Sequence, residues 1–111
     1  MPQQKWNTYS ASWSQPEAER NAVLATLATS DVTYTDPTVA LSGPEAFSAY
    51  MGEFQQQFPG TRFEIIDVHE HHEQSLANWK LVTDADETVM LGTSHARLSP
   101  DGKFRSFTGF F

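Results

Sequence analysis

Hydrophobic residues recur at helical spacing in three segments of the first half of the chain. In the first segment, residues 4–13, large aromatic side chains stand at i, i+3 and i+7, on one helical face: Trp6, Tyr9 and Trp13. The second segment has the apolar stripe Ala18, Val23, Leu24 and Leu27. The third has the apolar stripe Phe47, Tyr50, Met51 and Phe54. The pattern therefore predicts three amphipathic helices in this half of the chain.

Polar motifs predict where these helices begin and end. Ser14-Gln15-Pro16-Glu17 and Ser42-Gly43-Pro44-Glu45 both match the capping box, in which a serine hydroxyl and a later glutamate satisfy free backbone amides. The second helix is expected to end near Thr29-Ser30. The third is expected to end at Pro59-Gly60, because proline and glycine interrupt helices.

Alternating and β-branched residues predict strands elsewhere. Val32-Thr33-Tyr34-Thr35 forms a short strand before the third helix, and four longer strand-like segments follow it: 62–70, 75–83, 87–98 and 103–111. Thr83-Asp84-Ala85-Asp86 and Ser99-Pro100-Asp101-Gly102 are turn signals between the last three segments. Helices followed by consecutive antiparallel strands predict an α+β fold, with helices packed on one face of a curved antiparallel sheet.

The alternation of side chains along each strand predicts which residues face the helices. The inward set is Ala77, Trp79, Leu81, Met90, Gly92, Ser94, Ala96, Phe107, Gly109 and Phe111. The outward set of the segment 87–98 is Leu91, Thr93, His95 and Arg97. Gly92 and Gly109 stand in the middle of strands, where they are expected to mark bends or to leave room for a ligand.

Composition narrows the classes of function. With 111 residues, the chain is expected to form one domain, residues 1–111. A net charge of −7 argues against nucleic-acid and anionic-membrane partners. The absence of cysteine excludes disulfides, thiolate catalysis and zinc–thiolate sites. No apolar run approaches the roughly 20 residues of a membrane span, and no signal-like segment begins the chain, so a cytoplasmic location is expected.

Asp36 is the most informative candidate residue. It follows the predicted strand directly and precedes Pro37, so we expect it at the mouth of a pocket lined by aromatic residues and methionine. A buried carboxylate is costly, and such groups often take part in proton transfer. The alternative is a plain turn carboxylate, because Asp-Pro is a common turn former.

Nine further residues are candidates for contact with a ligand in this pocket: Trp13, Phe47, Tyr50, Phe54, Trp79, Leu81, Met90, Phe107 and Phe111. Their alternative role is plain core, and about half are expected to touch the cavity. His69 and His71 share one strand face and could form a metal pair, but no third ligand is evident, so no metal site is predicted. His95 is expected on the outer face of the sheet.

The order helix, helix, strand ending in Asp-Pro, helix, four strands resembles the SnoaL-like branch of the nuclear transport factor 2-like superfamily, which includes polyketide cyclases and ketosteroid isomerase. The matching stretches are Trp13 with the helix after it, DVTYTDP at 31–37, SGPEAF at 42–47, FPGTRF at 58–63, NWKL at 78–81 and LSPDGKFRSFTGFF at 98–111. The resemblance covers nearly the whole chain. It implies a cone-shaped curved sheet wrapped by three helices around a deep apolar pocket, and a homodimer formed through the outer sheet face.

The resemblance also implies roles for three residues. In ketosteroid isomerase the aspartate before the proline at the strand end is the general base, and Asp36 occupies that position. A tyrosine of the first helix and a protonated aspartate stabilise the oxyanion there. Tyr9 matches the tyrosine, and Ser94 stands in place of the aspartate. The loop from Asp36 to Gly43 looks shorter than in that enzyme. A serine is a weaker donor than a neutral carboxylic acid, and this departure argues against steroid-type isomerisation.

Three functions follow from these expectations. The first is a cofactor-independent isomerase or cyclase, in which Asp36 transfers a proton next to the carbonyl of a small apolar or aromatic substrate while Tyr9 and Ser94 polarise the oxygen. The second is a non-catalytic module that binds an apolar metabolite or only dimerises, with Val89 and Leu91 on its outer face. Epoxide-type hydrolysis ranks last, because Arg97 is expected on the outer face. No cofactor is expected, and the sequence does not specify the substrate.

Overall fold

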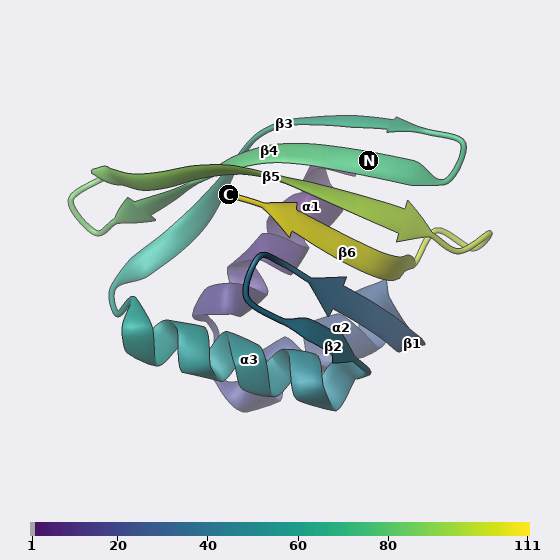
Figure 1. Ribbon diagram of the computed structural model, residues 1–111, viewed down its shortest axis with the longest axis horizontal. Helices are drawn as coiled ribbons and strands as arrows, with labels where there is room; N and C mark the ends of the chain where they lie inside the picture. The colour runs from purple at the N-terminus through teal and green to yellow at the C-terminus, as the bar shows by residue number, and fades with distance from the viewer. Residues whose placement is uncertain (1) are drawn as a thin grey trace.

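The computed structural model describes residues 2–111, in which helices cover one side of a curved sheet (Figure 1). The helices are α1 (Pro2–Ala11), a 3-10 turn (Ser12–Ser14), α2 (Glu17–Leu27) and α3 (Pro44–Gln57). The strands are β1 (Ala28–Thr35), β2 (Ala40–Ser42), β3 (Thr61–His71), β4 (Gln74–Thr83), β5 (Thr88–Leu98) and β6 (Phe104–Phe110). The α+β class and the predicted helices and strands are confirmed, with small shifts at their ends.

The sheet is mixed, in the order β2-β1-β6-β5-β4-β3. The strands β3 to β6 pair antiparallel with their neighbours in sequence, as predicted. β1, however, runs parallel to β6, with Tyr34 opposite Phe107. The prediction of a purely antiparallel sheet is wrong at this pair because α3 and four strands separate β1 from β6 in sequence, so no hairpin sets their relative direction.

Neither predicted capping box forms. The N-cap of α2 is Pro16, and the Ser14 hydroxyl instead donates to the Thr61 carbonyl at 3.2 Å. The N-cap of α3 is Gly43, at φ +89°, a conformation that glycine adopts without steric cost. Each serine therefore lies before the residue that caps its helix, too early for its hydroxyl to reach the helical amides.

The chain between α2 and α3 holds more strand than predicted. α2 ends at Leu27 rather than near Thr29-Ser30, and β1 begins at the next residue. The loop expected after Asp36 contains β2, which pairs antiparallel with β1 and places Ser42 opposite Thr33. A three-residue strand has too little pattern to be found in the sequence, because only its pairing stabilises it.

The core lies between the helices and the concave face of the sheet. Trp6, Tyr9 and Trp13 are all buried, which confirms the predicted inner face of the first helical segment. The indole of Trp6 donates to the Ser75 hydroxyl at 2.8 Å and so ties α1 to β4. Phe104 packs between Trp6 and Tyr9, with ring centroids 5.1 and 5.6 Å away. These contacts hold α1 against the sheet.

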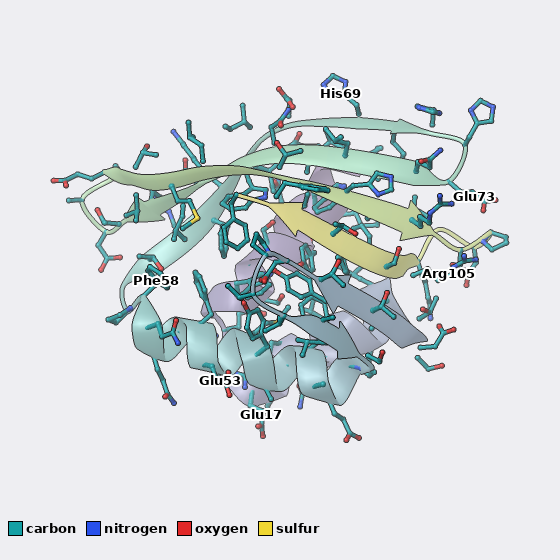
Figure 2. All side chains as sticks on the ribbon, in the orientation of Figure 1. Glu17, Glu53, Phe58, His69, Glu73 and Arg105 are labelled. Carbon is teal, nitrogen blue, oxygen red and sulfur yellow. The ribbon has the colours of Figure 1, made fainter. Side chains whose placement is uncertain are left out.

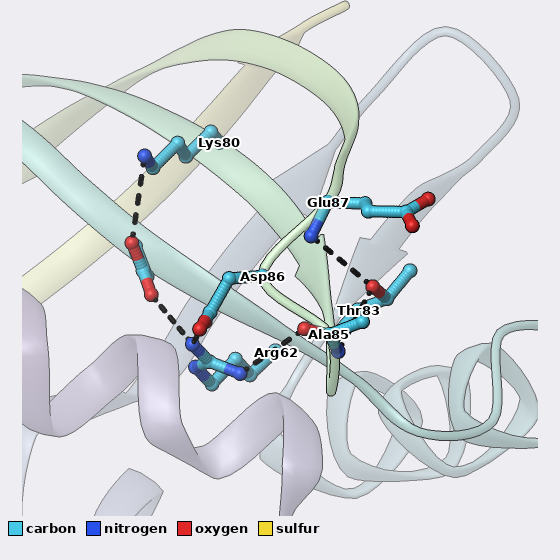
Figure 3. A network of polar contacts seen from close by, with 7 residues as sticks. Arg62, Lys80, Thr83, Ala85, Asp86 and Glu87 are labelled. Carbon is cyan, nitrogen blue, oxygen red and sulfur yellow. Dashed lines mark hydrogen bonds and ion pairs between the residues drawn. The ribbon is translucent and has the colours of Figure 1, made fainter.

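The two predicted turns of the sheet are confirmed. The Gly102 amide donates to the Ser99 carbonyl at 2.9 Å. In the other turn, the Thr83 hydroxyl accepts the amides of Ala85 and Glu87 at 3.3 and 3.2 Å (Figure 3).

An ion-pair network lies beside the second turn (Figure 3). Arg62 pairs with Glu64 at 2.9 Å and with Asp86, and Lys80 lies 3.7 Å from Glu64. All four side chains are exposed to water, so these pairs contribute little to the stability of the fold. No helix within residues 2–111 is long and apolar enough to cross a lipid bilayer.

Candidate functional site

A cavity of about 270 Å³ lies under the sheet, between α1, the 3-10 turn, α3 and strands β3 to β5. Six of the nine predicted ligand contacts line it: Trp13, Tyr50, Phe54, Trp79, Met90 and Phe111. The three predicted catalytic residues, Asp36, Tyr9 and Ser94, line it as well. The structure therefore brings together residues from the two ends of the chain, such as Tyr9 and Phe111.

Aromatic rings form most of the cavity wall. Trp13 meets Tyr50, Phe54 and Phe63 edge-on, with ring centroids 6.0, 5.3 and 5.7 Å apart. Phe63 meets Trp79 at 5.0 Å, and Trp79 lies 6.0 Å from Phe111. The rings thus follow one another from α3 across β3 and β4 to the C-terminal residue.

Three of the predicted ligand contacts lie in the core instead of in the cavity wall: Phe47, Leu81 and Phe107. Phe107 stacks on Tyr9 at 4.3 Å, and Phe47 stacks on Tyr34 at 4.7 Å. The two tyrosines line the cavity, and the two phenylalanines pack against their rings. In the sheet, Leu81 of β4 lies opposite Phe63 of β3 and Met90 of β5. The longer side chains of Phe63 and Met90 reach the cavity, and that of Leu81 does not.

Asp36 accepts five hydrogen bonds. Its Oδ1 accepts the Thr38 amide at 2.8 Å, the Thr38 hydroxyl at 2.9 Å and the Val39 amide at 3.2 Å. Its Oδ2 accepts the hydroxyls of Tyr34 and Tyr50, each at 2.8 Å. A carboxylate has about four lone-pair sites, so these donors occupy all of them. Asp36 is therefore both a turn carboxylate, through Oδ1, and a cavity residue, through Oδ2.

These donors decide the protonation of Asp36. Burial by itself raises the pKa of this carboxyl, but the bonds from the Thr38 amide, Tyr50, Tyr34 and the Thr38 hydroxyl outweigh burial and hold the pKa below 3.8. Burial raises the pKa of Tyr34 and Tyr50, and Asp36 adds to both shifts. At neutral pH the site is an ionised carboxylate held by two neutral phenols. Because its pKa is lowered, Asp36 is a weaker base than a carboxyl group whose pKa is raised.

Tyr9 and Ser94 share an arrangement that the sequence does not reveal. The Trp13 indole donates to the Tyr9 hydroxyl at 3.1 Å, and the Trp79 indole donates to the Ser94 hydroxyl at 3.0 Å. Within residues 2–111, neither hydroxyl finds an acceptor for its own proton. Burial also raises the pKa of Tyr9, so its phenol is neutral. Both hydroxyls can therefore donate a hydrogen bond to a molecule in the cavity.

Several lining residues were not predicted from the sequence: Trp6, Ser10, Tyr34, Thr38, Glu53, Gln57, Phe58 and Phe63. Tyr34 had a usable signal, because it stands two residues before Asp36 and so shares its strand face. Tyr50 was expected only as part of the wall, whereas its hydroxyl holds Asp36. That contact depends on how α3 packs against β1, which the sequence pattern does not specify.

The two mid-strand glycines have different surroundings. A Cβ on Gly92 would lie 2.2 Å from Cζ2 of Trp79, so the space at Gly92 is taken by that ring and not by a ligand. A Cβ on Gly109 would lie 3.6 Å from Cβ of Asp36 and 3.7 Å from the Tyr34 hydroxyl oxygen, which is ordinary contact. Gly92 thus allows Trp79 to lie flat along the sheet and reach Ser94.

The histidines lie away from the cavity. His69 projects from the outer side of the sheet (Figure 2), and the ring of His95 lies 3.3 Å from Gln74. Arg97 is exposed, as strand alternation predicted. Across the part of the chain that the structure describes, no three His, Cys, Asp or Glu side chains come together to hold a metal ion.

The family model of the SnoaL-like domain matches residues 9–107 of the chain. The chain belongs to the SnoaL-like domain family. No curated protein sequence matches this domain.

Solved structures share the cone fold of this SnoaL-like domain. One is a proposed isomerase of the SnoaL-like family from Agrobacterium tumefaciens, with 24% identity, a TM-score of 0.89 and coverage of 96% of this chain and 93% of that chain. A proposed polyketide cyclase from Sinorhizobium meliloti has 12% identity, a TM-score of 0.74 and coverage of 96% and 93%. A protein with a ketosteroid isomerase-like fold from Catenulispora acidiphila, in complex with trimethylamine, has 14% identity, a TM-score of 0.73 and coverage of 100% and 87%. At these identities the likeness shows the fold alone.

Proposed function

We propose that this SnoaL-like domain binds a small, largely apolar molecule in its cavity. The observation that carries the proposal is an aromatic-walled space of about 270 Å³ with an ionised carboxylate and two free hydroxyl donors in its lining. Ligand pockets are typically apolar with a few convergent polar groups, and this one lies just below their usual range of roughly 300–1,000 Å³. A small ligand fits these dimensions. The complex of a related fold with trimethylamine makes amines one class of ligand to test.

The hydrogen bonds and the lowered pKa of Asp36 favour ligand binding over proton transfer as the function of the cavity. A general base needs a free lone pair and a pKa near the working pH. Asp36 has its lone pairs occupied by five donors, and its pKa is lowered. The carboxylate therefore supports the role of a fixed charge in the cavity better than that of a proton acceptor.

The three tryptophan indoles provide a test of binding. Trp13 and Trp79 donate to the cavity hydroxyls of Tyr9 and Ser94, whereas Trp6 donates to the core residue Ser75. Titration with cyclohexanone, followed by NMR of the indole N–H signals, should move the Trp13 and Trp79 signals saturably and the Trp6 signal least. A ligand of this size is expected to bind with a Kd of about 1 mM.

Two substitutions on neighbouring residues of β5 locate the binding. Met90→Trp fills the inner side of the strand and is expected to remove the response. Val89→Trp adds the same bulk to the exposed outer side and is expected to preserve the response. Equal shifts of all three indole signals, or no saturable shift, would contradict the proposal.

Isomerase or cyclase chemistry is the second candidate, favoured by the free hydroxyl protons of Tyr9 and Ser94. For this reaction Tyr50 would release Oδ2 of Asp36, which would take the proton from the carbon next to a carbonyl. The enolate oxygen would accept bonds from the two hydroxyls until the carbon regains a proton.

The assay for this reaction is exchange of the α-hydrogens of cyclohexanone in D₂O. Asp36→Asn should abolish exchange above the solvent rate, and an unchanged rate would reject this candidate.

We also propose a homodimer formed through the outer face of the sheet. Supporting it, four large apolar side chains of β3, β5 and β6 are exposed there: Ile66, Val89, Leu91 and Phe110. A monomer rarely leaves such a contiguous apolar surface open to water.

A further inference from the structure

We propose that the cavity selects a small organic cation whose charge is a methylated ammonium group without N–H donors. This inference rests on the proposed binding function and names the class of ligand that the cavity would take.

The charges around the cavity are all negative. Among the lining residues within 2–111, Asp36 and Glu53 are acidic, and none is lysine, arginine or histidine. Glu53 is exposed, whereas Asp36 is partly buried and accepts the hydroxyls of Tyr34 and Tyr50. An anionic ligand would meet two carboxylates and no balancing cation, which disfavours carboxylates and phosphates as ligands. A cation would find a favourable potential, reinforced by the net charge of −7.

The walls suit a cation as well as an apolar group. Ten of the seventeen lining residues are aromatic. The faces of such rings carry partial negative charge and attract ammonium groups, most strongly those of tryptophan and tyrosine. Around this space the Trp13 and Tyr50 rings stand at 82° to each other, and the Phe63 and Trp79 rings stand at 87° to each other. This arrangement resembles the aromatic cages in which other proteins hold methylated ammonium groups.

The hydrogen bonds of Asp36 distinguish among cations. A primary ammonium has three N–H donors, each of which needs an acceptor when water is removed. Asp36 has no free lone pair for them, because five donors already occupy its oxygens. Its negative charge nevertheless remains and attracts a cation through space. A methylated ammonium uses that attraction without needing an acceptor.

The decisive comparison uses the unaltered chain and two ligands of the same shape. Choline carries a trimethylammonium group, and 3,3-dimethylbutan-1-ol has carbon in place of the charged nitrogen. Their Kd values are measured by NMR, where ring currents should also move the methyl protons of the bound ligand upfield. Choline is expected to bind about tenfold more tightly, as a cation–π contribution of about 1.4 kcal/mol would produce. Ethanolamine, with its primary ammonium, should bind more weakly than choline.

Variants locate the source of this preference. Asp36→Asn keeps an acceptor for the Thr38 and Val39 amides while removing the charge, so the preference for choline should fall severalfold. Glu53→Gln, at an exposed position, should lower it less. Because the two-ligand comparison needs no variant, the proposal stays testable even where Asp36→Asn does not fold.

The outcomes separate this inference from the binding function. Equal or tighter binding of the neutral alcohol would overturn the cation preference and leave the binding function intact. If neither ligand binds at tens of millimolar, the inference is overturned, and the cyclohexanone titration decides the binding function by itself. Tighter binding of ethanolamine than of choline would also contradict the inference, because it would show that the cavity supplies acceptors for the N–H groups of the ligand.

Discussion

Asp36 shows how neighbouring donors can reverse the effect of burial on a single carboxyl group. Burial disfavours its charge, but two phenols, one hydroxyl and two backbone amides hold the ionised form. Its position before Pro37 creates the turn that supplies the amides, while Tyr34 and Tyr50 come from β1 and α3. The residue thus connects a local turn to the cavity chemistry.

The lowered pKa of Asp36 predicts how stability depends on pH. A carboxyl group with a lower pKa in the folded than in the unfolded state stabilises the fold above the unfolded pKa, and this contribution is lost as pH falls through the folded pKa. Asp36→Asn should therefore cost about 1.5–3 kcal/mol at pH 7, the range for hydrogen bonds to a charged group. Urea unfolding of both proteins should show this difference shrinking below pH 3.8. A difference that stays constant or grows with acidity would contradict the assignment.

At the scale of elements, the contact between β4 and β5 shapes the cavity wall. Trp79 lies over Gly92 of the neighbouring strand and donates to Ser94, two residues further along β5. A methyl group at position 92 would collide with the indole at 2.2 Å. Gly92→Ala should therefore cost about 1–3 kcal/mol, as overpacking does. It should also displace Trp79 from Ser94, which the indole N–H signal of Trp79 would report.

Gly109→Ala is the matched control on the adjacent strand. Gly109 is also a mid-strand glycine, but an added Cβ would make only ordinary contacts at 3.6–3.7 Å. The free energy of unfolding of Gly109→Ala should differ from that of the unaltered chain by about 1 kcal/mol at most. Equal destabilisation by the two substitutions would show that the Trp79 contact does not control the wall.

Sequence pattern predicted those features that depend on local spacing. Strand alternation placed Ser94 toward the cavity and His95 on the other face, and helical spacing placed Trp13 and Phe54 in the wall. It did not predict β2 or the parallel pairing of β1 with β6, because both depend on partners distant in sequence. The same limit applies to the site: the position of Asp36 follows from chain order, but its bond from Tyr50 depends on tertiary packing.

At the scale of the whole molecule, the helices cover only one side of the sheet and leave the other open (Figure 1). Leu91 is 65% exposed and Phe110 is 60% exposed on that open face. We predict that the unaltered chain is a dimer by light scattering at micromolar concentration, and that Leu91→Asp makes it a monomer by placing a charge in the apolar contact. Ala25→Asp, on the exposed surface of α2, should remain dimeric. A monomeric unaltered chain would refute this assembly.

A ¹³C NMR titration of the Asp36 carboxyl group, with Tyr50→Phe measured beside the unaltered chain, tests whether Asp36 is a fixed negative charge. We expect a midpoint below 3.8 in the unaltered chain and a higher one in Tyr50→Phe, because that variant loses one donor to Oδ2. A midpoint well above 3.8 in the unaltered chain would contradict this expectation. Asp36 would then be a carboxyl group ready to exchange protons near neutral pH, and not a fixed negative charge in the cavity.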